Sequence, residues 1–518
     1  MRKNMKKINI NKLTLLLLSA LVFAGCKKDF LEVDPQGQTT EVLALTDPGA
    51  ADKLVGGVYN TLYFGGFGKT TVGFLWHTSN DVASDDADKG STPGDYNTGG
   101  LGDIDNFVHT AGNGIFNNIW SGHYNAIIAA NKAIDVLNQS TLEPGTKNRL
   151  LGEARFLRGL FYFNLVRYFG GVPKITTVPL PTEGNSDAVN TRATAAEIYA
   201  VVIEDFQFAI DNLPLKGEAG TQVGRANKGA AQAFLAKVYL YQKNWAKVLE
   251  LTNAVITSNK YSLVTDYNLI FREKPVGNQG GNNNSESIFE VQTGVNAARN
   301  AISPLFSNSQ GPRGRGGWND LGFGFNNPTT DLVSAYEAGD TRRNATIIFI
   351  NPTVPAPNST GTVLWDGFRI PSKDSVENER YNYKVYHSNT AESFQIAGDK
   401  DNKPKNIRLM RYAEVLLMYA EASAMAGSGD GVAKLNQVRA RANLLPTTLS
   451  QANVWKERRV ELAMEADRFL DLVRQGRAGT VLRAHGKPFV DGKHELFPIP
   501  QLQRDLSGNR LTQNNGYQ

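Results

Sequence analysis

The strongest constraint on the fold is a helix-turn-helix pattern at residues 228–258, KGAAQAFLAKVYLYQKNWAKVLELTNAVITS. In a tetratricopeptide unit the first helix carries a leucine, a small residue and an aromatic residue, and Leu235, Ala236 and Tyr239 occupy these positions. Trp245 opens the second helix with another aromatic ring. Small residues let paired helices approach closely, and aromatic rings fill the groove between stacked units. The pattern therefore predicts a scaffold of stacked helical pairs.

Helical periodicity recurs along the chain and extends this scaffold beyond one pair. Residues 47–64 open with an aspartate cap and a proline in the first turn. Residues 146–169 are apolar on most sides, as in a helix buried between neighbours, and the GGVP that follows contains the residues that end helices. We predict a mostly α-helical, tetratricopeptide-like scaffold with irregular spacing. Further helices are predicted at 115–138, 194–213, 408–443 (a pair) and 450–475.

Two long stretches, residues 65–114 and 275–405, show no sustained helical period. Both are rich in Gly, Asn, Pro, Ser and Thr, and the second contains short strand-like pieces, SIFEVQT and NATIIFI. Loops of this length inside a compact domain are usually functional or disordered. Their aromatic residues argue against disorder alone. We therefore expect these two insertions to carry the functional site.

The N-terminal segment has the properties of a secretory signal. Residues 1–12 contain five basic side chains and no acid, and an apolar run follows from Leu13 to Gly25. As a helix this run would extend about 20 Å, short of a hydrocarbon core of roughly 30 Å. The string VFAGC resembles a bacterial lipobox, so residues 1–25 are predicted to be a lipoprotein signal peptide and Cys26 to carry the lipid. The alternative is an ordinary signal peptide with a chance cysteine.

The net positive charge of the chain comes from the basic residues of this predicted signal peptide. The whole sequence has 55 basic and 50 acidic residues, and five of the basic residues lie in the signal. The mature chain would thus be close to neutral. Nucleic acid binding requires a clustered positive surface, so this balance argues against a nucleic acid partner.

Four blocks later in the chain resemble the SusD/RagB family of Bacteroidetes outer-membrane lipoproteins. They are GEARFLRGLFYFNLVRYFGGVP, RYAEVLLMYAEA, ERRVELAMEADRFLDLVRQG and LFPIPQLQRDLSGNRLTQNNGY, in this order. With the lipobox and DFLEVDP after it, the resemblance covers the whole mature chain, and residues 26–518 are interpreted as one SusD-like domain.

The resemblance implies a fold and a set of partners. Such proteins are lipid-anchored at the outer-membrane surface and cover a SusC-like TonB-dependent transporter, to which they deliver glycans or, in some members, peptides. Their fold is a helical tetratricopeptide scaffold whose irregular insertions carry the ligand site. We therefore expect a glycan ligand, a transporter partner and attachment to the membrane through the lipid alone.

Motifs for catalysis or cofactor binding are missing from the sequence. GGFGKTT at 65–71 has Tyr63 where a phosphate-binding loop requires its first glycine. HExxH and GxSxG are absent, and six scattered histidines with a single cysteine give no zinc pattern. SDDADKGS at 84–91 fails the EF-hand spacing because Gly90 falls at a ligand position, which leaves calcium as a minor alternative. No enzyme activity, cofactor or metal is predicted.

A carboxylate stripe, Glu457, Glu461 and Glu465, recurs every four residues in the predicted helix 450–475. Glycosidases use paired carboxylates, but these groups flank a sugar from opposite sides. Arginines interleave with the stripe, so ion pairing along the helix, such as Glu465 with Arg468 or Asp471 with Arg474, is the structural interpretation that we favour.

The candidate ligand-binding residues are the aromatic side chains of the two insertions and the polar side chains beside them. A sugar ring has an apolar face and a polar rim, so flat aromatic rings supply contact area and Asp or Arg can bind the hydroxyls. A purely structural role, in which these rings attach the loops to the scaffold, is the alternative for each residue. The candidates are Phe67, Trp76, Asp81 and Tyr96 in the first insertion, and Arg313, Trp318, Phe323 and Trp365 in the second.

Three functions follow from these observations. We favour a non-catalytic cell-surface protein that binds oligosaccharide or polysaccharide for a transporter. A binder of peptides or another nutrient is the first alternative, and a surface glycoside hydrolase is a more remote one.

Overall fold

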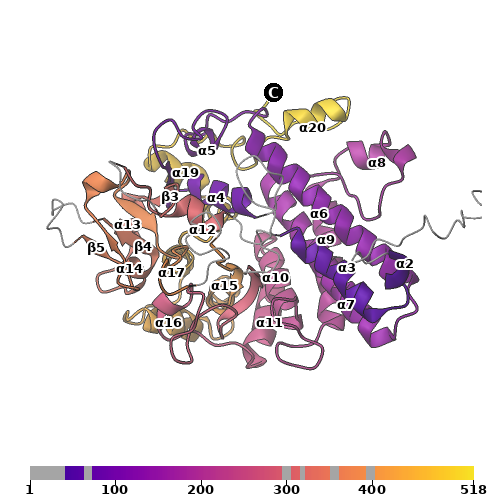
Figure 1. Ribbon diagram of the computed structural model, residues 1–518, viewed down its shortest axis with the longest axis horizontal. Coiled ribbons are helices and arrows are strands. Elements are labelled where there is room, and N and C mark those ends of the chain that lie inside the picture. The colour runs from indigo at the N-terminus through magenta and orange to yellow at the C-terminus, as the bar shows by residue number, and fades with distance from the viewer. Residues whose placement is uncertain (1–40, 63–72, 294–304, 316–320, 351–360, 393–402) are drawn as a thin grey trace, which may run out of the picture.

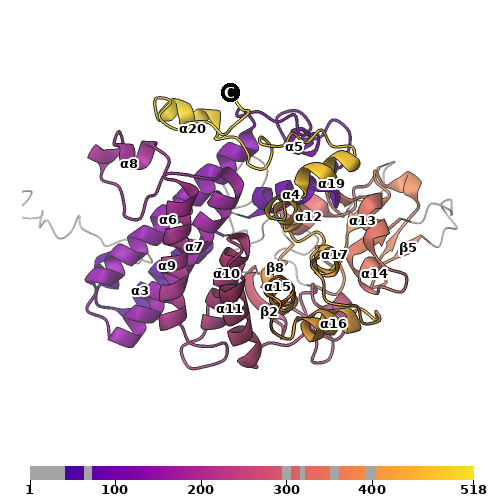
Figure 2. The ribbon, with the colours of Figure 1, turned by 180° about the vertical axis from the view of Figure 1, so that it is seen from behind.

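The computed structural model describes residues 41–62, 73–293, 305–315, 321–350, 361–392 and 403–518. Figures 1 and 2 show the long helices of the N-terminal half on one side of the molecule and the short strands and helices of the second half on the other. None of the helices in these described ranges is long and apolar enough to cross a bilayer. Phe67, Trp318 and Cys26 lie outside the described residues.

The N-terminal half is built mainly from long helices, and α3 begins at the predicted aspartate cap. α3 (Pro48–Asn60) starts after Asp47, whose carboxylate accepts a hydrogen bond from the Ala50 N–H at 2.8 Å. α7 (Pro144–Phe169) lies against α6 and α9, and every residue from Leu150 to Phe169 except Arg155 is buried. The helices of this half are α2 (Glu41–Ala44), α3, α6 (Gly114–Gln139), α7, α8 (Asp187–Asn190) and α9 (Ala195–Asn212).

Paired helices continue the scaffold into the middle and the C-terminal part of the chain. α10 (Lys228–Tyr241) and α11 (Trp245–Thr257) form the predicted helix-turn-helix, and α11 also contacts α15 (Tyr412–Ala426). α15 ends at Gly427 in a left-handed conformation, and α16 (Gly431–Arg441) returns beside it. The expected fold class, a helical tetratricopeptide-like scaffold with short strands in the insertions, is confirmed.

The predicted helix 450–475 is wrong as a single element. The chain forms α17 (Gln451–Glu461), a turn, and α18 (Arg468–Arg474), and Met464 and Ala466 adopt φ values of 64° and 67° in the turn. The helical pattern breaks because the turn has partners elsewhere: the Ala466 N–H donates to a carboxylate oxygen of Asp81 at 2.9 Å. Two short helices follow, α19 (Ala478–Ala484) and α20 (Gln501–Leu506).

The two insertions fold into short strands and helices rather than open loops. Each strand pairs with one antiparallel partner, and two of the four pairs join distant parts of the sequence. The pairs are β1 (Ala87–Gly90) with β3 (Phe325–Pro328), β2 (Ser287–Val291) with β8 (Ile407–Arg411), β4 (Ile347–Phe349) with β7 (Arg380–Asn382), and β5 (Thr362–Val363) with β6 (Arg369–Ile370). The helices are α4 (Phe74–Val82), α5 (Leu101–Asp105), α12 (Phe306–Gln310), α13 (Thr330–Ala335) and α14 (Arg342–Thr346).

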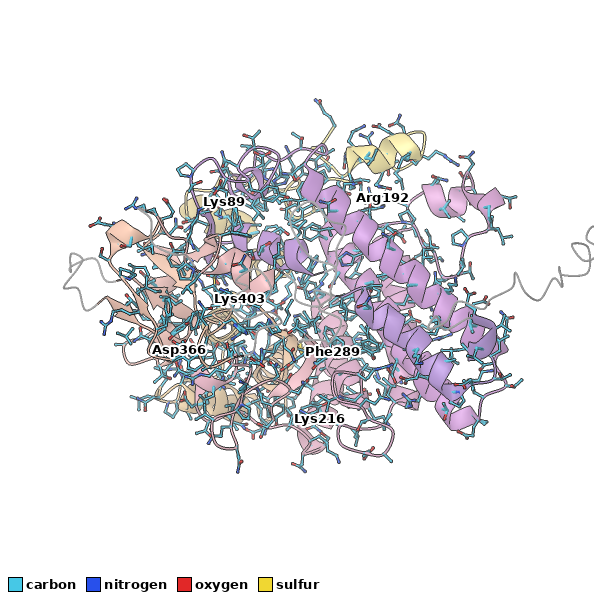
Figure 3. The ribbon with its side chains drawn as sticks, in the orientation of Figure 1. Lys89, Arg192, Lys216, Phe289, Asp366 and Lys403 are labelled. Carbon is cyan, nitrogen blue, oxygen red and sulfur yellow. The ribbon has the colours of Figure 1, made fainter. Side chains whose placement is uncertain are left out.

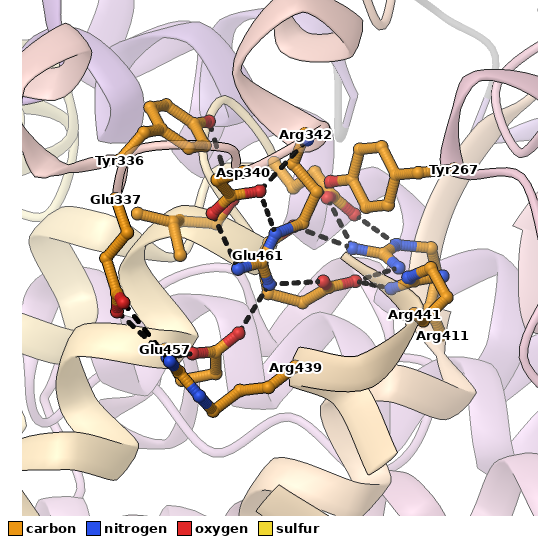
Figure 4. Close-up of polar contacts among 12 residues, drawn as sticks. Tyr267, Tyr336, Glu337, Asp340, Arg342, Arg411, Arg439, Arg441, Glu457 and Glu461 are labelled. Carbon is orange, nitrogen blue, oxygen red and sulfur yellow. Dashed lines mark hydrogen bonds and ion pairs between the residues drawn. The ribbon is translucent and has the colours of Figure 1, made fainter. Parts of the chain in front are cut away.

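Glu457 and Glu461, two carboxylates of the predicted stripe, lie in a buried ion-pair network (Figure 4). The Glu461 carboxylate is fully buried and accepts from Arg342 at 3.0 Å, Arg411 at 2.9 Å and Arg441 at 2.5 Å. Ion pairing of Glu457 and Glu461 is therefore confirmed, but the expected pairing along the helix is wrong for both, because their partners come from other elements.

The two short-range pairs that we predicted for this region differ in outcome. Asp471 and Arg474 form the expected pair at 2.6 Å. Glu465 instead pairs with Arg411 and Lys384, each at 2.7 Å, and Arg468 pairs with Asp85 at 2.7 Å. The predicted pair of Glu465 with Arg468 is thus wrong, because the chain turns between these residues and each side chain meets a partner from another element.

Candidate ligand-binding surface

The β1–β3 pair brings the two insertions together and creates a half-exposed polar and aromatic surface. β1 leads into Ser91, Asp95 and Tyr96, and the segment before β3 carries Arg313 and Phe323. The backbone N–H of Ser91 donates to the carbonyl of Gly324 at 2.6 Å, which fixes one segment against the other. We call these five residues the Arg313 surface. Figure 3 labels Lys89, which lies near the end of β1 and close to this surface.

An ion pair forms the polar part of the Arg313 surface. Arg313 Nη1 lies 2.6 Å from Asp95 Oδ2 and donates to Ser91 Oγ at 3.2 Å, and Ser91 Oγ donates in turn to Asp95 at 2.9 Å. The side chains of Arg313 and Asp95 remain 30% and 35% exposed, so both can reach a ligand. Partial burial would raise the pKa of Asp95, but hydrogen bonds from Thr92 and Ser91 and the Arg313 charge hold it below its usual value. Asp95 is therefore an anion at neutral pH.

Aromatic rings form the second part of the surface. Tyr96 and Phe323 are half-buried and pack against the main core, and the Tyr96 ring lies 6.4 Å from that of Phe325 in an edge-on arrangement. Burial raises the pKa of Tyr96 to about 12, so its hydroxyl stays protonated and can donate a hydrogen bond. Rigid rings of this kind offer apolar contact area with a fixed orientation.

Two residues of the Arg313 surface have a strained backbone conformation, which nine other non-glycine residues of the described chain also adopt. Ser91 and Tyr96 adopt φ values of 56° and 47°, a conformation that non-glycine residues rarely take. Gly324, at φ +74°, passes so close to Arg313 that a Cβ atom at this glycine would lie 2.8 Å from the arginine Cβ. Strained residues persist where surrounding contacts hold them, and they cluster at ligand sites.

Trp76 and Asp81, expected at the ligand surface, are instead buried in α4. Trp76 is 8% exposed, and the Arg167 guanidinium lies 5.3 Å from its ring centre. Asp81 is fully buried and accepts hydrogen bonds from the Asn326 side chain and the Ala466 backbone, both at 2.9 Å. The structure thus places both residues inside the protein, where α4 packs against the second half of the chain.

Asp81→Asn is expected to change the pH dependence of stability. Burial raises the pKa of Asp81 to about 7 from an ordinary value of 3.8, so the folded protein holds a proton between pH 4 and 7 that the unfolded chain releases. The wild type should therefore lose stability relative to the variant as pH rises across this window, by at most roughly 4 kcal/mol. Urea unfolding of both proteins from pH 4 to 8 measures the difference.

The control for this prediction is Asp187→Asn, whose side chain is 81% exposed in its pair with Arg510. It should leave the shape of the pH profile unchanged. A constant difference between wild type and Asp81→Asn at all pH values would show that Asp81 is ionised throughout.

Two of the three carboxylates in the acidic run at 84–91 pair with arginines. Asp85 forms a bidentate pair with Arg468 at 2.7 and 2.8 Å, and Asp86 accepts from Arg459 at 2.8 Å. In the part of the chain that the structure describes, no group of three or more His, Cys, Asp or Glu side chains is arranged to hold a metal ion.

The remaining candidate, Trp365, is not part of the Arg313 surface. It is half-buried against a separate small core that includes Ile370, Tyr381 and Tyr386. Of the sequence candidates, the structure therefore brings Tyr96, Arg313 and Phe323 together. Ser91 and Asp95 were missed, although Asp95 stands next to Tyr96 in PGDYNTGG and could have been included as a carboxylate neighbouring an aromatic ring.

A helical scaffold that carries a half-exposed charged and aromatic patch on its insertions is typical of a ligand-binding protein. Comparison with known families agrees with this class. A family profile described as "Starch-binding associating with outer membrane" matches residues 29–240, and one described as "SusD family" matches residues 285–517. The chain belongs to the SusD/RagB family.

Similarity to known relatives and solved structures extends over most of the chain. A SusD-like protein of Bacteroides ovatus is 26% identical, over 89% of this chain and 82% of that protein. The structure of a "Laminarin binding SusD-like protein" is 28% identical with a TM-score of 0.74, covering 90% of this chain and 99% of the other. The surface glycan-binding protein A of Bacteroides thetaiotaomicron in complex with laminarihexaose is 23% identical and shares the fold, with a TM-score of 0.76 over 91% of this chain and all of the other.

Proposed function

We propose that this protein binds oligosaccharide or polysaccharide at the cell surface through the Arg313 surface, without catalysis, and delivers it to a SusC-like TonB-dependent transporter. The observation that carries the proposal is the half-exposed Asp95–Arg313 pair, which joins the two chain segments that also carry the half-buried rings of Tyr96 and Phe323. A carboxylate and a guanidinium together accept from and donate to sugar hydroxyls, and the rings contact the apolar face of the sugar. The 28% identical structure described as laminarin-binding supports a glycan as ligand.

Two measurements test this function. A screen of purified full-chain protein against glycan and peptide libraries should give saturable binding to glycans only. Saturable binding to peptides alone would instead support the first alternative function, a binder of peptides or another nutrient. Incubation with each glycan ligand, followed by analysis of its chain length, should show no cleavage, since Glu457 and Glu461 are fully engaged by arginines.

The transporter partner follows from family membership. Detergent extraction of tagged protein from its own host should recover a much larger TonB-dependent β-barrel. Recovery of this protein alone, under conditions that preserve other such complexes, would contradict the partnership.

Cys26→Ala is expected to move the protein from the outer-membrane fraction to the soluble fraction. We propose that the Cys26 lipid is the membrane anchor, because VFAGC follows a short apolar run and lipid chains supply the binding energy to the bilayer. Fractionation should be done in a strain that lacks the transporter, with Lys27→Ala as the control. A Cys26→Ala protein that still pellets with the outer membrane there would contradict the anchor.

A further inference from the structure

An open cleft lies between α19 and the N-terminal part of α13, and a side chain of β1 also lines it (Figure 1). It holds about 670 Å³, within the roughly 300–1,000 Å³ typical of ligand sites. Most small-molecule sites are lined by apolar and aromatic groups, whereas the described walls of this cleft are mainly polar and include no Phe, Tyr or Trp. We call it the α19 cleft, and its polar side chains include Asp88, Asp331, Arg477, Thr480 and His485.

Ion pairs fix the most buried side chains of the α19 cleft. Arg468 binds Asp85 through two contacts of 2.7 and 2.8 Å, and Arg459 lies 2.9 Å from the same carboxylate. Arg459 Nε also donates to Asp86 at 2.8 Å. These charges already have partners, so they hold the walls in place before a ligand arrives and leave ligand binding to other groups.

Two charged side chains of the cleft, Arg477 and Asp88, have no ion-pair partner among the described residues. Arg477 Nη1 donates to Gln475 at 3.2 Å, and its guanidinium lies 5.2 Å from the Trp455 ring centre, so most of its N–H groups remain without an acceptor. Burial and the nearby charge of Arg468 lower the pKa of Arg477. Asp88 is exposed on β1. One guanidinium and one carboxylate are therefore available, as a donor and an acceptor.

Charges of opposite sign balance around the α19 cleft. Its walls carry four arginines and three aspartates, and Asp86, which pairs with Arg459, supplies a fourth carboxylate. Asp331 lies 3.3 Å from His485, and the exposed Thr480 adds a hydroxyl group. A sugar hydroxyl both donates and accepts hydrogen bonds. A balanced set of donors and acceptors therefore suits an uncharged sugar better than an ion of either sign.

The α19 cleft is a neighbour of the Arg313 surface, because β1 contributes to both. Asp88 and Ser91 are three residues apart, so their Cα atoms are at most about 11 Å apart. Lys89, between them, is tied to the Arg313 surface, since its ammonium donates to the Asp95 carbonyl at 3.0 Å. The two sites thus lie on one strand.

We propose that the α19 cleft is a second binding site for an uncharged oligosaccharide, in which Arg477 donates to the sugar hydroxyls and Asp88 accepts from them. This inference rests on the proposed glycan-binding function and adds a site to it. The described walls offer no Phe, Tyr or Trp ring to contact the apolar face of a sugar, so we expect weaker binding than at the Arg313 surface, in the millimolar range. NMR detects binding of this strength, whereas calorimetry detects the stronger site.

NMR of the full chain with ¹³C-labelled histidine tests this site, because His485 lines the cleft and the chain has six histidines. The His485 resonance is assigned through its loss in His485→Gln, and the pH is held constant so that proton uptake does not move it. The probes are cellohexaose, laminarihexaose, maltohexaose, mannohexaose and xylohexaose, with hexagalacturonate as the anionic comparison. We expect saturable shifts of His485 with at least one neutral hexasaccharide and none with hexagalacturonate, while the resonance of the fully buried His123 stays fixed.

Arg477→Gln and Asp88→Asn should each weaken the response about tenfold, because each removes a charged hydrogen-bonding group. Arg483→Gln is the matched control: Arg483 is also on α19, is 45% exposed in its pair with Asp491 and does not line the cleft, so the response should be unchanged. An unshifted His123 resonance shows that each variant is folded. The proposal is overturned if no neutral hexasaccharide shifts His485, if hexagalacturonate shifts it as strongly, or if Arg477→Gln and Asp88→Asn both behave like Arg483→Gln.

Arg313→Gln separates this inference from the proposed function. It should weaken the glycan binding that calorimetry detects and leave the shift of His485 in place. If Arg313→Gln weakens glycan binding and no hexasaccharide shifts His485 in the wild type, the proposed function stands and the second site is refuted. If a hexasaccharide shifts His485 but Arg313→Gln binds glycans like the wild type, the second site stands and the Arg313 surface is refuted as a glycan site.

Discussion

Replacing Arg411 with methionine is expected to lower the free energy of unfolding by about 3–5 kcal/mol, the cost typical of breaking a buried ion pair from one side. The Arg411 side chain is 1% exposed and contacts Glu286 at 2.5 Å, Glu461 at 2.9 Å and Glu465 at 2.7 Å. Methionine fills similar space but leaves these carboxylates short of a cation. Equilibrium urea unfolding, followed by circular dichroism, measures the loss.

The matched control is Lys132→Met, which removes one member of an ion pair with Glu41 at the surface. The two side chains are 48% and 52% exposed, so this change should cost no more than about 1 kcal/mol. Equal losses for the two variants would mean that the buried network contributes no more than a surface pair.

The double substitution Tyr96→Ala and Arg313→Ala is expected to abolish measurable glycan binding in a protein that is less stable but still folded. Loss of a stacking ring costs on the order of 1–3 kcal/mol, by analogy with nucleic acid bases, and loss of a charged hydrogen bond about 1.5–3 kcal/mol. A protein that delivers its cargo must release it, so affinity should be in the micromolar to millimolar range, about 4–8 kcal/mol. Removing both contacts therefore weakens binding roughly a hundredfold or more, beyond detection by calorimetry.

Each single variant should weaken binding by a smaller, measurable amount. Arg343→Ala serves as the control, since this arginine is stacked on Phe349 in a different part of the insertion. A folded double variant that binds the glycan like the wild type would place the ligand site elsewhere on the protein.

The helical scaffold was predictable because the sequence signals that indicate a helix, apolar periodicity and capping residues, lie within the helix itself or next to it. Periodicity located α3, α6, α7 and α9–α11, and the Asp47 cap marked where α3 begins. The break after α17 was not predictable, because it depends on Asp81, which binds the backbone of Ala466 from a distant part of the chain.

The candidate site was predictable only in part, for the same reason. Composition indicated which loops carry exposed aromatic rings, and Tyr96, Arg313 and Phe323 do lie together. The sequence of α4 gives no sign that Trp76 and Asp81 are interior, since their partners Arg167 and Asn326 come from other elements. Pairing of Asp95 with Arg313 likewise requires the β1–β3 contact, which local patterns do not encode.

The late position of Glu461 in the chain sets an order of assembly during synthesis. Arg342, Arg411 and Arg441 are all made before the α17 carboxylate that they share. Until that helix has been synthesised, three cations lack a common acceptor, and burying them costs several kcal/mol each. The second half of the molecule therefore cannot complete its core on a nascent chain that stops before α17. A chain interrupted there keeps only Asp340 and Glu286 as partners for these three arginines, so they stay exposed to solvent and this part of the chain stays open to proteolysis.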